Sequence, residues 1–156
     1  MPRRAPQLTI QEELMPALNP YLLFNGNAAD AVGFYESVFG VEAIITRFSD
    51  MGGTPEDMPE EVRNRVANAQ LPLSATNILM VSDTPPGNEI DNSKPGFTVQ
   101  IEADSAEEAE RLFTDLAKDG AVDMPFGKVE WAEAFGMLTD KFGTPWMVNY
   151  TGNAQG

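Results

Sequence analysis

The side chains able to carry acid–base or metal chemistry in this chain are carboxylates. The sequence contains no His and no Cys, which removes the usual general base near neutral pH, the thiolate nucleophile and the imidazole and thiolate ligands of transition metals. A Ser-His-Asp site is excluded, and any proton transfer would fall to Asp, Glu, Tyr or Lys. The carboxylates that lie near predicted strands are Glu102, Glu130, Glu133 and Asp140.

A metal site made from these carboxylates would need two or three of them to converge in one cavity. Buried carboxylates without an ion or a partner are costly, so convergence of this kind is rare. Most other acids fall on a predicted helix surface, such as Glu107 and Glu110, or in the loop over residues 50–65. We therefore expect no metal ion, no cofactor and no metal-dependent catalysis, with a carboxylate-based metal enzyme as the alternative.

The charge balance excludes several classes of partner. The formal net charge is −14, and the ten basic residues are scattered along the chain. A nucleic-acid groove or an anionic membrane surface requires clustered Lys and Arg, so we expect neither partner. No apolar run approaches the roughly 18 residues of a membrane span, and no apolar segment follows Arg3 and Arg4 as in a signal peptide. We expect a cytoplasmic location.

An internal repeat indicates how the chain is organised. Residues 27–38 and 105–116 both show apolar side chains at helical spacing, and each follows a strand-like run. Two copies of one supersecondary unit favour a pseudo-symmetric sheet with a shared concave face. The equivalent positions are Ala31 and Ala109, Phe34 and Leu112, Tyr35 and Phe113, and Val38 and Leu116.

Hydrophobic alternation predicts an α+β fold in which each half is a strand, a helix and three further strands. Asn27 is predicted to cap the first helix and Gly40 to end it, while Ser105 and Glu108 form a capping box for the second helix. A short helix is expected at 60–65. The predicted strands are 19–24, 41–48, 66–73 and 77–81 in the first half, and 97–102, 121–126, 134–139 and 146–150 in the second.

Several stretches resemble a known family. They are residues 20–27 (PYLLFNGN), 79–83 (LMVSD), 131–136 (WAEAFG) and 139–150 (TDKFGTPWMVNY). Together with the element order, they are similar to the vicinal oxygen chelate (glyoxalase/bleomycin resistance protein/dioxygenase) superfamily and its PhnB-like branch. The resemblance implies two βαβββ units forming a curved, incomplete mixed-sheet barrel around a pocket. It covers one domain over 18–151, with units at 18–83 and 96–151, a mobile N-terminal arm (1–17) and a tail (152–156).

The chain departs from the metal-binding pattern of that superfamily. The positions that resemblance assigns to metal ligands fall near Pro20, Met80, Phe97 and Met147, and none of these side chains suits a hard divalent ion. Members of the PhnB-like branch are sometimes labelled ubiquinone-pathway methyltransferases. The Gly-rich loop and helix of a common class of methyl-donor site is not recognisable in this chain.

The function expected from the resemblance is a metal-free pocket that binds a small organic molecule, in a homodimer with or without exchange of segments between its protomers. A metal-dependent lyase, dioxygenase or antibiotic-resistance protein, and a non-catalytic dimeric scaffold without a pocket, are the alternatives. Trp131 could wall a pocket or pack in the core, Glu133 could be a pocket acid or a solvated rim residue, and Trp146 is expected in the core. The pocket candidates are Asn68, Met80, Trp131, Glu133 and Met147.

Overall fold

The computed structural model describes residues 17–52, 58–93 and 95–154. The predicted N-terminal arm up to residue 16, the middle of the loop predicted over 50–65 and the last two residues of the tail lie outside the described residues. Among the helices that are described, none is long and apolar enough to cross a membrane.

The order of elements confirms the predicted α+β repeat of strand, helix and three strands. The first half contains β1 (Tyr21–Phe24), α2 (Ala28–Phe39), β2 (Ile44–Arg47), β3 (Val66–Pro72) and β4 (Ile78–Asp83). A 3-10 turn η1 (Phe48–Met51) and the short helix α3 (Glu60–Arg63) lie between β2 and β3. The second half contains β5 (Val99–Glu102), α4 (Ala106–Ala117), β6 (Ala121–Val129), β7 (Ala132–Thr139) and β8 (Pro145–Tyr150).

Each half forms its own four-stranded mixed sheet. The strand orders are β1-β4-β3-β2 and β5-β8-β7-β6, and in both sheets the first strand runs parallel to the last while the remaining pairs are antiparallel. The two sheets are open and do not close into a barrel within the chain. The two halves therefore share one strand topology, and contacts other than strand pairing join them.

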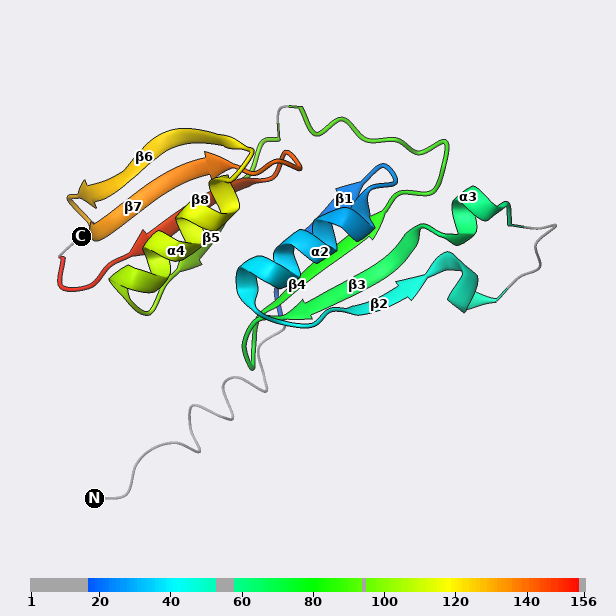
Figure 1. Cartoon of the computed structure of the whole chain (residues 1–156), viewed down its shortest axis with the longest axis horizontal. Helices are drawn as coiled ribbons and strands as arrows, with labels where there is room; N and C mark the ends of the chain where they lie inside the picture. The colour runs from blue at the N-terminus through cyan, green and yellow to red at the C-terminus, as the bar shows by residue number, and fades with distance from the viewer. Residues whose placement is uncertain (1–16, 53–57, 94, 155–156) are drawn as a thin grey trace, which may run out of the picture.

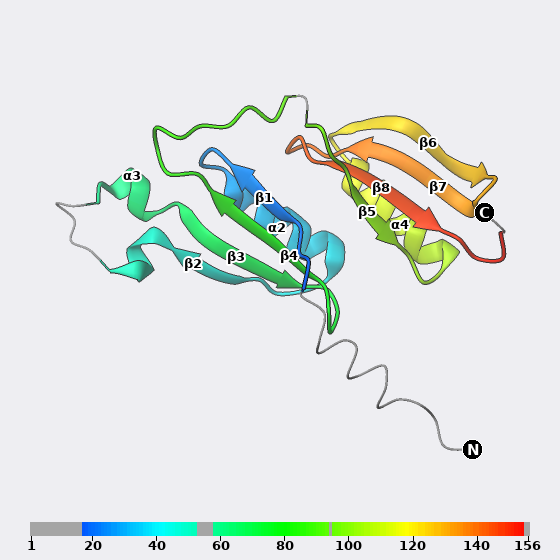
Figure 2. The same ribbon diagram turned by 180° about the vertical axis from the view of Figure 1, so that it is seen from behind.

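The two sheets lie side by side, and both helices lie on the same side of them. Figure 1 shows α2 and α4 in front of the sheets, and Figure 2 shows the sheets from the opposite side without a helix over them. The strands β1 and β5 form the adjoining edges of the two sheets (Figure 2). The molecule thus has a helix layer, a sheet layer and one sheet face in each half that no described helix covers.

The first helix, α2, begins and ends by different means. Gly40 ends it as predicted, with a left-handed φ of 66° and its N–H donating to Glu36 O at 2.8 Å. The prediction that the Asn27 side chain caps the helix is wrong, because Asn27 makes no capping hydrogen bond. Instead the Asp83 carboxylate, at the end of β4, accepts hydrogen bonds from the N–H groups of Gly26 (2.7 Å) and Ala28 (2.9 Å).

The second helix, α4, begins with half of the predicted capping box. The Ser105 hydroxyl accepts a hydrogen bond from the Glu108 N–H at 3.1 Å. The Glu108 carboxylate accepts from the N–H of Asp104 at 3.0 Å rather than from that of Ser105. Both bonds still satisfy main-chain donors at the helix start, which is the physical purpose of the box.

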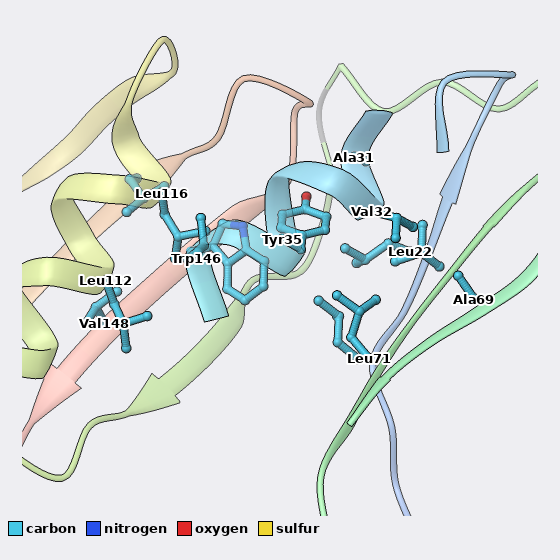
Figure 3. Packing of buried hydrophobic residues seen from close by; sticks show 14 of the residues in the cluster. Leu22, Ala31, Val32, Tyr35, Ala69, Leu71, Leu112, Leu116, Trp146 and Val148 are labelled. Carbon is cyan, nitrogen blue, oxygen red and sulfur yellow. The ribbon is translucent and has the colours of Figure 1, made fainter. Parts of the chain in front are cut away.

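One hydrophobic core runs through both halves on the helix side of the sheets. The α2 side chains pack on Leu22, Ala69 and Val81, and the α4 side chains pack near Val148 in the same cluster. Tyr35 and Trp146, each no more than 1% exposed, meet between the halves with ring centroids 5.8 Å apart. Figure 3 shows these two rings between the side chains of the first and second halves. The predicted core position of Trp146 is confirmed.

A buried carboxylate completes the junction between the halves. Asp140, 3% exposed, accepts hydrogen bonds from the Tyr35 hydroxyl at 2.6 Å and from the Trp146 indole N–H at 2.9 Å. Its other oxygen accepts from the N–H groups of Phe142 and Thr144, which stabilises the β7–β8 hairpin. Burial, together with the negative charge of Asp140, raises the pKa of Tyr35 well above its ordinary value, so its hydroxyl remains a donor.

Candidate functional site

The face of the first sheet that turns away from α2 carries uncharged side chains. On this open face, Tyr21, Met80 and Gln70 stand side by side on β1, β4 and β3. The neighbouring row, with Leu22 and Val81, is buried against the helix because side chains alternate along a strand. The open face therefore offers apolar surface and hydrogen-bonding groups without a fixed charge among these positions.

Polar side chains on this open face are linked to one another. The Asn68 amide nitrogen donates to the Tyr21 hydroxyl oxygen at 3.2 Å, and the Gln70 amide donates to the Asn68 carbonyl oxygen at 3.3 Å. Tyr21 remains 45% exposed. The three side chains form a polar row in which the phenol proton of Tyr21 is free to turn to a bound molecule.

The open face of the second sheet has an apolar part and a polar part. Met137 and Met147 lie opposite each other on β7 and β8, next to Gln100 on β5. One row further along, Phe135, Asn149 and Glu102 occupy the same three strands. The thioethers provide adaptable apolar surface, and the second row provides an aromatic ring, an amide and a carboxylate.

The five predicted pocket residues fall on the open side of the molecule in two groups. Asn68 and Met80 lie on the first sheet, and Met147 lies on the second. Trp131 packs edge-on against Phe135 with ring centroids 5.2 Å apart, and Glu133 lies two residues before Phe135 on the same strand face. The chain does not bring the two groups into one enclosed cavity, because its sheets lie side by side.

Three of the strand-associated carboxylates, Asp140, Glu133 and Glu102, are bonded to different parts of the chain. Asp140 lies in the core on the helix side, bonded to Tyr35 and Trp146. Glu133 accepts a hydrogen bond from the N–H of Asn153. Glu102 accepts bonds from the Asn149 amide (2.7 Å) and from the N–H of Thr151 (3.0 Å).

The charge state of Glu102 follows from these bonds. Partial burial raises the pKa of Glu102, but the hydrogen bonds from Thr151 and Asn149 outweigh burial and hold the pKa below its ordinary value. Glu102 is therefore ionised near neutral pH. Across residues 17–52, 58–93 and 95–154, no three carboxylates are grouped in a way that could hold a metal ion.

Cavities of small-molecule size lie along the seam between the two sheets. One of about 420 Å³ is lined by Tyr21, Phe97 and Thr144 among others, and one of about 470 Å³ lies between the β1 and β5 edges. A third, of about 520 Å³, extends to Gln100 and Glu102. The five predicted pocket residues do not line these cavities, which adjoin the open faces at Tyr21 and Gln100.

Sequence reasoning missed several of the polar groups on the open faces. Gln70 and Gln100 were not singled out, although period-two alternation places each on the same face as a predicted residue of a neighbouring strand. Asn149 lies two residues after Met147, so the same alternation could have identified it. Its bond to Glu102, 47 residues away, carried no local sequence signal.

The two βαβββ units and their side-by-side placement define a glyoxalase-like fold. A glyoxylase/bleomycin resistance protein/dioxygenase domain from Frankia sp. EAN1pec matches with a TM-score of 0.59 and 14% identity, over 89% of this chain and 99% of that one. At this level of identity the match shows the fold alone.

The particular family follows from the sequence. The model of the family described as 3-demethylubiquinone-9 3-methyltransferase matches residues 16–149, and the chain belongs to this PhnB-like family. The Escherichia coli (strain K12) protein YjdN is 34% identical over 140 residues, covering 85% of this chain and 93% of YjdN. The predicted resemblance to the PhnB-like branch is thereby confirmed.

Two solved structures agree with this assignment. Protein PA1353 from Pseudomonas aeruginosa has a TM-score of 0.73 and 35% identity, over 91% of this chain and 100% of that one. A putative 3-demethylubiquinone-9 3-methyltransferase, PhnB protein, from Bacillus cereus has a TM-score of 0.66 and 28% identity, over 86% and 99%.

Proposed function

We propose that this protein binds a small organic molecule, without a metal ion, between the open face of its own sheets and a second copy of the chain. The observation that carries the proposal is that two sheet faces, which no described helix covers, lie on one side of the molecule (Figure 2). Each face combines thioether surface with a few hydrogen-bonding groups, which is the usual composition of a small-molecule site.

A second copy is part of the proposal because one chain leaves both faces open. Apolar side chains remain well exposed on the open side of the first sheet, including Tyr21 at 45% and Leu23 at 41%. Contiguous apolar surface of this kind marks interaction sites in soluble proteins. The open faces of two copies, set opposite one another, would enclose a chamber with Asn68 and Met80 on one wall and Met147 and Trp131 on the other.

Two features of the chain support binding without a metal. There is no His anywhere in the sequence, and the open-face carboxylates Glu102 and Glu133 are already bonded to chain N–H groups. The proposed function does not include the methyl transfer named in the family description, because the Gly-rich loop and helix of a common class of methyl-donor site is not recognisable in the sequence. A cytoplasmic location completes the proposal and would be checked by cell fractionation.

The first experiment measures metal and ligand binding to untagged protein, since a His tag would supply imidazoles that the chain lacks. We expect no stoichiometric metal by elemental analysis, no micromolar binding of Mn, Ni or Zn by calorimetry, and a rise in melting temperature with some members of a chemically broad library. Stoichiometric metal would replace the proposal with a carboxylate-based enzyme. No shift with any compound would leave a scaffold without a ligand.

The role of the second copy is tested by light scattering during size-exclusion chromatography. We expect a dimer for the native chain and a monomer for Leu23→Glu, which places a charge on the open face. Val122→Glu, a matched change at a 52% exposed residue in the row that pairs with buried Leu138, should remain dimeric. A native monomer at concentrations where ligand binds would refute the enclosed chamber.

A further inference from the structure

A cluster of five side chains on the open face of the second sheet combines aromatic rings with hydrogen-bond acceptors. Its members come from the β6–β7 turn and from β7, β8 and β5, whose register places Phe135, Asn149 and Glu102 in one row. We call this group the Trp131 cluster. It comprises Trp131, Glu133, Phe135, Asn149 and Glu102.

The aromatic part of the cluster presents an indole to solvent. Trp131 is 45% exposed, although its ring packs edge-on against Phe135, which is only 7% exposed. A core tryptophan would be buried, and a surface tryptophan without a packing partner would not be held in one position. Trp131 is instead held by a T-shaped contact with Phe135 while nearly half of its surface stays exposed. An indole is the best aromatic partner for a cation.

The polar part of the cluster contains an acceptor with no donor. Asn149 is 4% exposed, and its amide nitrogen donates to Glu102 at 2.7 Å and to the Thr151 hydroxyl at 3.0 Å. The nitrogen has to face Glu102, because an ionised carboxylate only accepts. The Asn149 amide oxygen therefore turns away from Glu102, and it has no hydrogen-bond partner among the described residues. A buried oxygen left without a donor costs free energy unless something supplies one.

The charges at the cluster are negative. Glu102 and Glu133 both lie on this face, and in the part of the chain that the structure describes no basic side chain is bonded to either. Their negative charges are therefore locally uncompensated by these contacts. An anionic ligand would be repelled here, while a cation would be attracted.

We infer that the Trp131 cluster binds the protonated amino group of a small organic amine. The ammonium lies over the face of Trp131, one of its N–H bonds donates to the Asn149 amide oxygen, and Glu133 and Glu102 supply the negative field. The inference rests on the proposed function, because the cluster forms one wall of the proposed chamber. The Asn149 amide oxygen is fully covered, so the amine reaches it only after a neighbouring side chain moves. Of the two aromatic side chains in the cluster, Trp131 is the more exposed.

The test compares three probes of similar shape and different charge. They are 2-phenylethylamine, 2-phenylethanol and 3-phenylpropanoate, titrated at pH 7 into the full-length protein and followed by calorimetry and tryptophan fluorescence. We expect the amine to bind roughly tenfold or more tightly than the alcohol, as a partly desolvated cation–π contact implies, and the propanoate to bind weakest. Equal binding of the three probes would overturn the inference.

Matched variants locate the site. Trp131→Leu should weaken amine binding roughly tenfold while Trp131→Phe retains most of it, because only the phenylalanine keeps an aromatic face. Glu133→Gln should weaken the amine about threefold and leave the alcohol unchanged. The control Val122→Ala changes an exposed side chain of the row opposite buried Leu138 and should have no effect. Unchanged amine affinity in Trp131→Leu would refute the site.

The outcome separates this inference from the proposed function. If library compounds raise the melting temperature but the amine does not bind at millimolar concentration, the inference is wrong and the proposed site remains. If no compound of any class binds, both fail. Urea unfolding of each variant shows whether a loss of binding reflects a loss of folded protein, and Trp131→Phe serves as the second variant in that case.

Discussion

Two buried aspartates, Asp83 and Asp140, have the same chemistry and opposite structural roles. Asp83 is 4% exposed and accepts hydrogen bonds from the N–H groups of Gly26, Ala28 and Val66, all in its own half of the chain. Asp140 is 3% exposed and accepts from Tyr35, a side chain of the other half, as well as from its own hairpin. One carboxylate organises a half, and the other joins the halves.

Burial of a carboxylate does not mark the side of this protein that we propose binds a ligand. Both aspartates lie where main-chain or side-chain donors satisfy them, which is what makes a buried carboxylate tolerable. The carboxylates on the open side, Glu102 and Glu133, are exposed. The two most buried acids therefore stabilise the fold, and they do not lie on the face that we propose binds a ligand.

The largest effect is expected from removing the carboxylate that joins the halves. Asp140→Ala leaves the buried Trp146 N–H without an acceptor and the Tyr35 hydroxyl with the Thr144 hydroxyl alone, at 3.1 Å. The change should lower the free energy of unfolding by about 4 kcal/mol. Urea titration followed by circular dichroism measures the change. A loss below about 1 kcal/mol would show that the junction depends on apolar packing alone.

Removing the other aspartate should cost somewhat less. Asp83→Ala frees three main-chain N–H groups, including the one at the start of α2, and should lower the free energy of unfolding by about 2–3 kcal/mol. Asp83→Asn, which keeps the shape and an acceptor oxygen, should recover part of the loss. If Asp83→Ala proved more harmful than Asp140→Ala, the roles assigned to the two residues would have to be reversed.

Tyr35→Phe tests whether Asp140 joins the two halves through Tyr35 while Asp83 acts within its own half. Loss of the hydroxyl should cost about 1–2 kcal/mol, and the cost should be non-additive with Asp140→Ala but additive with Asp83→Ala within about 0.5 kcal/mol. Non-additivity with both aspartates, measured in a double-mutant cycle, would mean that the two carboxylates share one network.

Tyr35 also gives the junction a pH dependence at the alkaline end. Burial and Asp140 raise the pKa of Tyr35 in the folded protein, whereas the unfolded chain keeps the ordinary value of 10.0. The folded state then binds more protons above pH 10, so stability falls as the pH rises beyond that value. Tyr35→Phe should lose less stability between pH 9 and pH 11 than the native chain does. An identical alkaline loss would exclude Tyr35 as its source.

The smallest effect concerns the exposed carboxylate Glu102. Its pKa is below the ordinary 4.5, because hydrogen bonds to Thr151 and Asn149 outweigh partial burial. Its contribution to stability is complete above pH 4.5 and is lost as the pH falls through the lowered pKa. Solvent screening limits the contribution to less than about 1 kcal/mol. Glu102→Gln should therefore flatten the acid limb of the stability profile slightly, and a steeper limb would contradict this account.

Local patterns in the sequence predicted the elements of the fold well. Helical periodicity identified α2 and α4, because Ala31, Val38, Ala109 and Leu116 repeat at the spacing of one buried helix face. Gly40 ended α2 because its left-handed conformation suits glycine. The failed cap at Asn27 has a non-local cause, since Asp83 reaches the helix start from 55 residues away.

The candidate site was harder to predict than the fold. Family resemblance pointed to Met80 and Met147, and both lie on the open faces of the two sheets, but no local pattern says which face the helix covers. Asp140 shows the same limit. Its hydrogen bond to Phe142 joins neighbouring residues, whereas its bond to Tyr35 spans 105 positions and has no local sequence signal. Features that depend on one chain segment could be predicted from the sequence, and contacts between two distant segments could not.

The continuous core of this chain has a consequence for how it loses structure. Tyr35, Trp146 and Asp140 tie the helix sides of both halves into one packed unit, although the sheets themselves share no paired strands. Neither half can open without exposing the rings that the other half covers, so the two repeats form a single cooperative folding unit rather than two modules on a tether. The slowest amide exchange in α2 and in β8 is therefore governed by the same global opening.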